Sequence, residues 1–335
     1  MNRMLQALVI VVLTFGLAGA SLAQKKAAYI PCGRVNDGSW SQAGYEGMLT
    51  ARKKLGIKFD YIESPAQADV ETHARDFARK GYDIIVLHCA LFAHVGPKLA
   101  PEFPKTWFLS SNGVPPLPKN LALYEAQHEF TFVGGVLAGL MTKRGVIGTI
   151  GGFNFPEMNR EIESFKLGAR FVNSKARFVS TFINSWEDAA KAKEAALAQL
   201  DAGADVIAPF TDQAARGVFK AAEERGAYII ANYRDQNFLA PKTILASVEH
   251  HYDVILASMI GKVMKGTIKN EPYSFGSGER GILLSPYHGM AKIIPKKVQE
   301  KVQRVLEEVR DKKIVIPRMT KVGDGEKADL KTLVR

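Results

Sequence analysis

Two tryptophans occupy positions where α/β proteins bind small molecules. Trp40 lies in the loop Asp37-Gly-Ser-Trp40, between an apolar strand-like segment (27–32) and an amphipathic helical segment (41–55). Trp186 follows the strand-like segment 177–182 in the same way. Because strand-to-helix corners of a parallel sheet meet at its carboxyl edge, we expect both rings at the mouth of a cleft. Aromatic rings at both lips of a cleft predict the capture of a planar small molecule.

Polar residues follow several of the other predicted strands. A carboxylate accepts hydrogen bonds from ring N–H or amino groups, and an amide both donates and accepts them. With the two tryptophans, the candidate ligand-binding residues at this edge are Asp37, Asn112, Asn154, Asp212, Tyr233 and Glu249. Each of these polar residues could instead cap a helix or form a turn. Asp212 stands where the N-cap of a helix beginning at residue 213 would be.

The sequence carries no motif for catalysis. It has no Gly-x-Ser-x-Gly elbow, no glycine-rich phosphate loop and no His-Glu-x-x-His zinc pair. His250 and His251 adjoin Glu249, but consecutive side chains point apart, so we expect them on a solvent-facing segment between the lobes. We expect His88 and His94, which flank a strand end, at the rim of the cleft. The chain is therefore predicted not to be an enzyme and to need no metal or cofactor.

The first 23 residues have the features of a secretion signal. Arg3 supplies a positive charge, residues 5–17 form an apolar run too short to span a bilayer comfortably, and Ser21-Leu-Ala23 gives a cleavage site. The shortness of the run disfavours the alternative of a retained membrane anchor. No cysteine adjoins the cleavage site, so we expect no lipid anchor. The mature chain is predicted to begin at Gln24 and to be a soluble periplasmic protein.

The composition is that of a globular protein with two domains of ordinary size. Hydrophobic residues make up 47% of the chain and charged residues 24%. The net charge of +11 comes from dispersed basic residues. Because nothing resembles a DNA-reading motif, we expect no nucleic-acid partner. The excess charge serves solubility, docking to a membrane partner or attraction of an anionic ligand.

Two cysteines end strand-like segments of the exported chain. Cys32 and Cys89 would lie on neighbouring strands of a doubly wound sheet, so a disulfide is one alternative. Adjacent parallel strands rarely offer good disulfide geometry. The sequence therefore favours two small core residues.

Strand and helix signals alternate along the chain. The strand-like segments are short and apolar without clean alternation, as expected when helices cover both faces of a sheet. One series of strands spans residues 27–125, and a second series spans residues 146–231, with helical segments between the strands. Two successive α/β units predict two similar lobes.

The later segments are predicted to cross back between the lobes. We expect the first lobe to comprise residues 24–126 and 249–275, and the second lobe residues 127–248 and 276–320. Several crossovers of this kind form a hinge that opens and closes over a ligand. The polar segment 321–335 is predicted to be a peripheral tail.

Several motifs in order resemble the basic membrane protein family of ABC-transporter substrate-binding proteins, the purine nucleoside receptor-like group. The resemblance covers nearly the whole mature chain. The matching segments are Asn36-Asp-Gly-Ser-Trp-Ser-Gln42 with Tyr45-Glu-Gly47, Phe132-Val-Gly-Gly-Val-Leu-Ala-Gly-Leu-Met141, Gly145-Val-Ile-Gly-Thr-Ile-Gly-Gly152, Ser164-Phe-Lys-Leu-Gly-Ala169, Gly203-Ala-Asp-Val-Ile207 and Asp235-Gln236.

This resemblance implies a type I periplasmic-binding fold, two doubly wound parallel-sheet lobes joined by hinge crossovers. It also implies delivery of a ligand to an ABC permease in the inner membrane by a monomeric binding protein. Trp40 takes the place of the family's aromatic residue that stacks on a purine base. Asp37, in the same motif, takes the place of a family residue that contacts the ligand.

Two departures from the family pattern bear on the ligand. The family's Gly-Val-Asp, whose Asp is expected near a ribose, reads Ala231-Asn232-Tyr233 here. The expected Lys of the last crossover is replaced around Glu249 and His250. Both changes remove groups suited to a sugar. We therefore predict that a free purine base, or a related flat heterocycle, binds better than a nucleoside.

The sequence is compatible with other functions. A nucleoside-binding receptor of the same family and a receptor that presents its ligand to a membrane sensor are the alternatives within this fold. A periplasmic nucleoside hydrolase is disfavoured because no acidic metal-binding cluster lies near the N-terminus. A DNA-binding regulator would need a helix-turn-helix where the signal peptide stands.

Overall fold

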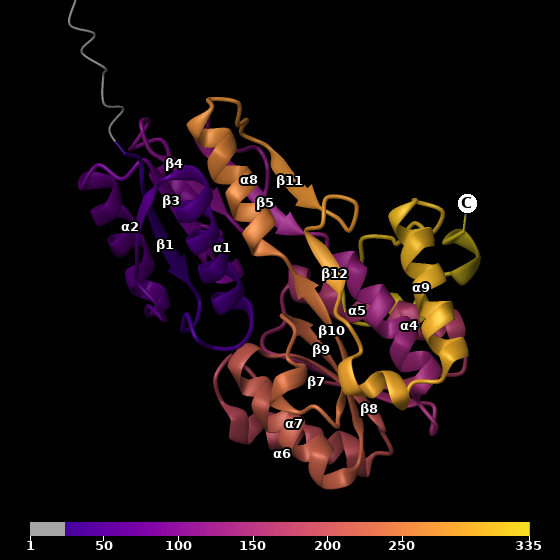
Figure 1. Cartoon of the computed structure of the whole chain (residues 1–335). Helices are drawn as coiled ribbons and strands as arrows, with labels where there is room; N and C mark the ends of the chain where they lie inside the picture. Colours follow the sequence, from indigo (N-terminus) through magenta and orange to yellow (C-terminus); the bar gives the residue numbers. More distant parts are fainter. Residues whose placement is uncertain (1–23, 335) are drawn as a thin grey trace, which may run out of the picture.

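The computed structural model describes residues 24–334, which form two α/β lobes side by side (Figure 1). Each lobe is built on a six-stranded sheet with helices on both faces. The predicted doubly wound, two-lobed architecture is thereby confirmed. The predicted signal peptide, residues 1–23, lies outside the described residues. Within residues 24–334, no helix is both long enough and apolar enough to cross a membrane.

The first sheet is entirely parallel and has the strand order β11-β5-β4-β3-β1-β2. Its strands are β1 (Lys26–Pro31), β2 (Lys58–Tyr61), β3 (Ile84–His88), β4 (Trp107–Ser110), β5 (Leu121–Ala126) and β11 (Pro272–Phe275). The helices of this lobe are α1 (Trp40–Leu55), α2 (Val70–Arg79), α3 (Val95–Leu99) and α8 (Tyr252–Met264). Although α8 comes late in the sequence, it packs against α1 (Figure 1).

The second sheet has the order β12-β10-β9-β8-β6-β7, with only its edge strand β12 antiparallel among the described pairs. Its strands are β6 (Val146–Gly151), β7 (Arg177–Phe182), β8 (Val206–Phe210), β9 (Tyr228–Tyr233), β10 (Ile244–His250) and β12 (Ile282–Leu284). Its helices are α4 (Thr131–Met141), α5 (Pro156–Val172), α6 (Ala189–Asp201), α7 (Ala215–Arg225), α9 (Lys296–Arg310) and α10 (Asp324–Lys327).

Three crossovers connect the two sheets. The chain passes from β5 to α4 through the 3₁₀ turn η3 (His128–Phe130), from β10 to α8, and from β11 to β12. Hydrogen bonds also join the lobes on the side of α1. Gln236 Nε2 donates to the Gly38 carbonyl at 2.9 Å, and Arg234 Nη2 pairs with Glu46 Oε1 at 2.8 Å. The two lobes are therefore in contact across the cleft, in a closed arrangement.

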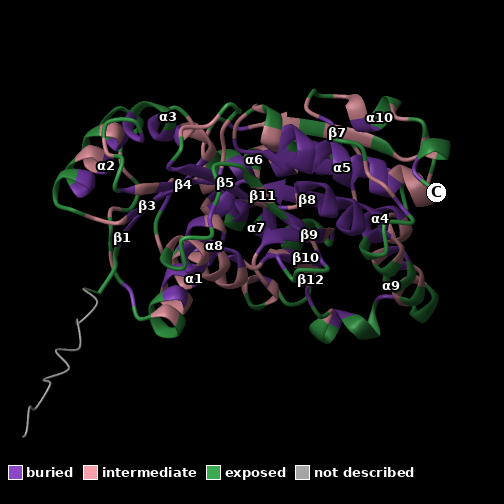
Figure 2. Cartoon of the chain, turned by 90° about the horizontal axis from the view of Figure 1, so that it is seen from above, coloured by how far each residue is buried: buried purple, intermediate pink, exposed green. Residues whose placement is uncertain are grey.

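The central helices and strands are buried on nearly every side. Every described position of β3 and β6 is buried, and α4 and α5 are covered almost throughout (Figure 2). Close packing of α4 on α5 depends on glycine: a Cβ at Gly135 would lie 1.8 Å from the Phe165 carbonyl oxygen. This rigid pair of helices supports the residues of α5 that face the cleft.

The C-terminal segment, predicted as a peripheral tail, is mostly exposed but packs on α5 through α10. Gly325 is buried, and its N–H donates to Glu163 Oε2 at 2.8 Å. Lys166, 1% exposed, pairs with both Glu163 and Glu326 at 3.0 Å. The polar residues of this segment thus pair with buried charged groups of α5.

Candidate ligand-binding site

A cavity lies between the carboxyl edges of the two sheets. Both lobes and the η3 crossover contribute to its walls. It is lined by Cys32, Trp40, Ala90 and Ser111 of the first lobe, by His128, and by Phe155, Glu157, Met158, Glu161, Trp186, Asp212 and Tyr233 of the second lobe. Four of the predicted binding residues, Trp40, Trp186, Asp212 and Tyr233, thus meet in one cavity.

Trp40, the first residue of α1, is held from several sides. Its indole stacks on the imidazole of His88 at 4.8 Å with an interplanar angle of 18°. Its Nε1 donates to the His88 carbonyl at 3.3 Å. Tyr233 and Tyr252 contact it edge-on at 5.4 and 5.0 Å. Because His88 covers one face of the indole, a ligand can stack only on the other.

His88 is fully buried, so its predicted place at the rim is wrong. Its Nδ1 shares a 2.8 Å hydrogen bond with the Tyr124 hydroxyl. Gly44 of α1 makes room for it, because a Cβ there would lie 2.5 Å from His88 Nε2. Burial lowers the pKa of His88 to about 3, so the imidazole is neutral. The last residue of β3 is covered because α1, which follows the neighbouring strand β1, approaches it this closely. His94, by contrast, is exposed.

Trp186 enters the cavity from the second lobe. Its ring lies against Gly152, where a Cβ would be 2.1 Å from the indole, and 5.1 Å from the ring of Phe153. Its Nε1 is buried and has no hydrogen-bond partner among the described residues. This indole N–H is a candidate donor to a bound ligand.

Asp37 organises the loop that carries Trp40. Its carboxylate accepts hydrogen bonds from the backbone N–H groups of Ser39, Ser41 and Gln42 at 2.7, 3.0 and 3.1 Å, and so caps the start of α1. It is 3% exposed and lies behind the cavity wall. Its direct contact with a ligand stays a prediction.

The other three candidates lie away from this cavity. The Asn112 side chain accepts a 2.7 Å hydrogen bond from the Gly113 N–H, as in a turn. Asn154 is exposed and accepts from Asn159 Nδ2 at 3.0 Å. Glu249 lines a second, polar cavity on the hinge side, beside Arg234 and His251. Their roles in ligand binding stay predictions.

Asp212 does not act as the N-cap that its position suggested. It has a positive φ of 47°, and its side chain makes no capping hydrogen bond to α7 or to the preceding 3₁₀ turn. Instead it crosses the cleft, where Ser39 Oγ donates to its Oδ1 at 3.2 Å. The N-cap prediction failed because the left-handed backbone turns the side chain toward the other lobe.

A buried ion pair in the cavity wall was not foreseen. His128 Nδ1 lies 2.6 Å from Glu161 Oε1, and the Tyr233 hydroxyl donates to Glu161 Oε2 at 2.7 Å. Burial opposes charge on His128, but the hydrogen bond and the negative charge of Glu161 outweigh it and raise its pKa. Burial likewise opposes charge on Glu161, but His128 lowers the pKa of that carboxyl. The spacing of Glu157, Met158 and Glu161 on one helix face was the available sequence signal.

His250 is 4% exposed, so the prediction of a solvent-facing position is wrong. Trp40, Tyr233 and His128 surround its ring at 5.1 to 6.1 Å. Neither ring nitrogen has a hydrogen-bond partner among the described residues. Burial lowers the pKa of His250 to about 3. The crossover from β10 to α8 runs through the interior between the lobes. The consecutive polar residues Glu249, His250 and His251 do not indicate this burial.

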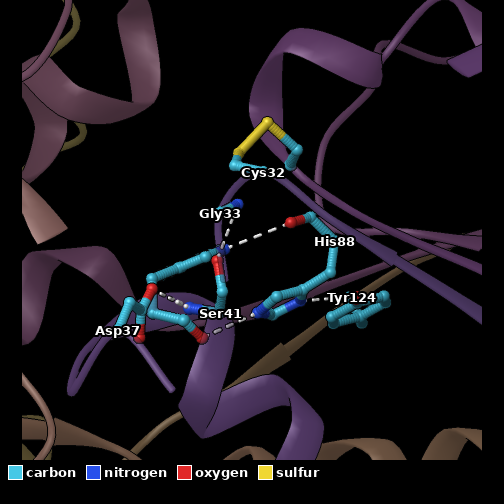
Figure 3. The surroundings of a disulfide bond; sticks show 8 residues. Cys32, Gly33, Asp37, Ser41, His88 and Tyr124 are labelled. Carbon is cyan, nitrogen blue, oxygen red and sulfur yellow. Dashed lines mark hydrogen bonds between the residues drawn. A yellow bond between two sulfur atoms is a disulfide. The ribbon is translucent and has the colours of Figure 1, made fainter. Parts of the chain in front are cut away.

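Cys32 and Cys89 form a disulfide, against the expectation of two separate core residues (Figure 3). Pro31 and His88 are register partners of β1 and β3, so the cysteines follow directly where the two strands end. Their Cα atoms are 5.1 Å apart, within the usual range for disulfides. The strand-geometry objection does not apply, because both residues lie just beyond the strands. The bond closes the wall of the cavity beside the Asp37 loop.

Known proteins match this chain over most of its length. Residues 24–320 match the family described as ABC transporter substrate-binding protein PnrA-like. A purine-binding protein of Brucella abortus is 30% identical over 299 residues, which cover 87% of this chain and 84% of the relative. The ABC transporter nucleoside-binding protein BmpA of Lactococcus lactis is 26% identical, with 90% and 92% coverage.

The fold is shared with solved structures. A solute-binding protein of an ABC transporter system from Aeropyrum pernix superposes with a TM-score of 0.82 at 20% identity, covering 93% of this chain and all of that one. The type I periplasmic-binding architecture predicted from the sequence is thereby confirmed. The chain belongs to the PnrA-like, basic membrane protein family of ABC-transporter substrate-binding proteins.

Proposed function

We propose that this protein binds a free purine base, or a related flat heterocycle, between its lobes and delivers it to an ABC permease in the inner membrane. One observation carries the proposal: Trp40 and Trp186, from different lobes, line the same cavity as Asp212. Two indoles and a carboxyl group supply stacking surfaces and in-plane hydrogen bonds, which together suit a flat heterocycle. The names of the two relatives, purine-binding and nucleoside-binding, support this class of ligand.

The residues at the two positions where the family pattern expects groups suited to a sugar favour a base over a nucleoside. Tyr233 stands where the family pattern expects an Asp near the ribose, and its hydroxyl is engaged with Glu161 at 2.7 Å. Glu249 belongs to the neighbouring cavity instead. No carboxylate is therefore offered to ribose hydroxyls from these two positions.

Isothermal titration calorimetry with paired bases and nucleosides tests the proposal. Adenine with adenosine and hypoxanthine with inosine are suitable pairs, after the protein has been unfolded and refolded to remove any retained ligand. We expect each base to bind more tightly than its nucleoside. A tenfold or greater preference for the nucleosides would contradict the proposal, and it would favour the nucleoside-binding alternative.

We further propose that the protein is a monomer of the periplasm. A closed binding protein presents the rims of both lobes to a permease, which requires no second copy. Transport is proposed over presentation to a membrane sensor because the family is one of importers. Uptake of labelled purine by cells with and without the gene would separate these roles.

A further inference from the structure

Asp212 reaches from the second lobe to the beginning of α1 in the first. Ser39 Oγ donates to its Oδ1 at 3.2 Å, and the residue is 7% exposed. The Asp212 carboxyl also lies within reach of the Trp40 backbone N–H, and the side chain lines the cavity. The first lobe thus holds the carboxyl at the wall of the cavity, where a ligand can reach it.

A second buried carboxyl group, that of Asp37, lies on the other side of Ser39. The Ser39 N–H donates to Asp37 Oδ1 at 2.7 Å, while the Ser39 hydroxyl donates to Asp212. Asp37 accepts three backbone N–H groups, whereas Asp212 has only the Ser39 hydroxyl and the Trp40 backbone N–H beside it and forms no ion pair with the described cations. Two buried carboxyl groups this close disfavour a second negative charge. Of the two, Asp37 is the better placed to keep the charge.

No described cation pairs with Asp212; Arg216 of α7 reaches the Asp37 loop at Gly38, but it is exposed and makes no ion pair with either carboxyl. Glu161 of α5 and His128 of η3 form a pair with no net charge. Glu157, at the start of α5, can add only negative charge. The other titratable side chains around the cavity are neutral histidines and buried phenols: His88, His250, Tyr29, Tyr233 and Tyr252.

We propose that Asp212 binds the ligand as a neutral carboxylic acid, with Asp37 carrying the negative charge of the pair. The inference rests on the proposed function, because the ligand is taken to be a purine. Burial and the charge of Asp37 both raise the pKa of Asp212, in agreement with the geometry. In the open form Asp212 faces water and is ionised at neutral pH. Closure over the ligand therefore takes up about one proton.

A neutral Asp212 also selects among ring edges. A carboxylic acid donates through its O–H and accepts through its carbonyl, so it pairs with an edge that has an acceptor beside a donor. Adenine offers such an edge at its amino group and either neighbouring ring nitrogen, and hypoxanthine offers one at O6 and N1–H. Guanine offers adjacent donors at N1–H and N2–H, which suit an ionised carboxylate instead. Guanine shares the O6 and N1–H edge of hypoxanthine, so a neutral Asp212 disfavours only guanine that is bound through its N1–H and N2–H edge.

Calorimetry on the full mature protein tests the proton first. Adenine is titrated at pH 6, 7 and 8 in two buffers with different ionisation enthalpies. We expect the wild type to take up about one proton and to bind up to about tenfold more weakly per pH unit. Asp212→Asn, which keeps a donor and an acceptor, should abolish both effects and bind more tightly than the wild type as the pH rises. Asp212→Ala should bind about tenfold to a hundredfold more weakly than Asp212→Asn.

Two results would overturn the inference. One is wild-type binding without proton uptake, and the other is an Asp212→Asn variant, folded by circular dichroism, as weak as Asp212→Ala at every pH. Spectra of the adenine-bound protein separate this failure from failure of the proposed function. In ¹³C spectra of carboxyl-labelled aspartate, we expect one carboxyl that is protonated at neutral pH in the adenine-bound wild type and is missing from adenine-bound Asp212→Asn. If no purine binds in calorimetry, the proposed function fails and the inference fails with it; if a purine binds and this signal is absent, the inference alone fails.

Discussion

The indole of Trp40 lies parallel to the imidazole of His88, 4.8 Å away, and donates its N–H to the carbonyl of the same residue. Two contacts to one neighbour fix both the plane and the rotation of the indole. His88 is in turn fixed by Tyr124 on β5. The orientation of the Trp40 indole in the cavity wall is thereby set before a ligand arrives, which lowers the entropic cost of binding.

Replacing Trp40 should weaken ligand binding in proportion to the lost ring area. We expect Trp40→Ala to raise the Kd about tenfold to a hundredfold, since stacking of a base on an aromatic ring contributes about 1–3 kcal/mol. Trp40→Phe should lose less. Trp107→Phe is the matched control, because Trp107 lies on β4 and outside the cavity lining. Calorimetry gives the Kd values, and equal effects of Trp40→Ala and Trp107→Phe would argue against stacking on Trp40.

Loss of the disulfide should lower both stability and affinity. The bond links residues separated by 57 positions, and closing a loop of that size stabilises the folded state by about 2–4 kcal/mol. We expect the Cys32→Ser, Cys89→Ser double variant to lose that amount in guanidinium unfolding. Because Cys32 also lines the cavity, the Kd of the double variant for a purine should be higher than that of the wild type. A variant that keeps wild-type stability and affinity would show that the strands alone hold this wall.

The alternation of short apolar strands and helices was enough to predict both sheets and the two-lobed fold. It was also enough to place Trp40, Trp186, Asp212 and Tyr233 at one edge, because strand ends in parallel sheets converge. Side-chain direction was not predictable in this way. The left-handed backbone at Asp212 and the buried crossover at His250 depend on contacts between segments far apart in the chain. Such contacts leave no local periodicity in the sequence.

The pairing of His128 with Glu161 could not be predicted from the sequence, for a related reason. The two residues lie 33 positions apart, on a crossover turn and in the middle of a helix. Neither position looks unusual until α5 packs against the turn. Strand pairing does not predict the disulfide, because the two cysteines lie one position past the strand ends, where the geometry of paired strands no longer applies.

Burial of His250 should make the protein sensitive to acid. Its pKa falls from 6.5 to about 3 on folding, so the unfolded chain binds more protons between these values. Its contribution to stability is complete above pH 6.5 and is lost progressively as the pH falls toward 3. Within this pH range, one such histidine lowers the free energy of unfolding by up to about 1.4 kcal/mol for each unit by which the pH falls.

A substitution isolates this contribution from other titrating groups. His250→Phe keeps an aromatic ring beside Trp40 and cannot be protonated, and His94→Gln, at an exposed position, is the control. We expect the free energy of unfolding of His250→Phe to fall less steeply than that of the wild type between pH 6.5 and 5. The measurement is urea unfolding across that range. Parallel pH profiles for the wild type and His250→Phe would mean that His250 gains a proton in the folded state.

The C-terminal segment should be needed for the stability of α5 and, through it, for ligand binding. Gly325 packs on the Glu163 carbonyl, and a Cβ there would lie 2.1 Å from that oxygen. Gly325→Ala should therefore push the turn away from α5, at a cost of about 1–3 kcal/mol. It also weakens the hydrogen bond from the Gly325 N–H to Glu163, which is buried beside Lys166.

Gly289→Ala is the matched control, because a Cβ at Gly289 meets no atom within 4 Å. Guanidinium unfolding should show a clear loss for Gly325→Ala and little change for Gly289→Ala. Because α5 also carries Met158 and Glu161 of the cavity wall, Gly325→Ala should weaken purine binding as well. If the two variants unfold at the same denaturant concentration, the tail is held too loosely to support α5, and the buried pair of Lys166 with Glu163 must be maintained by the helix alone.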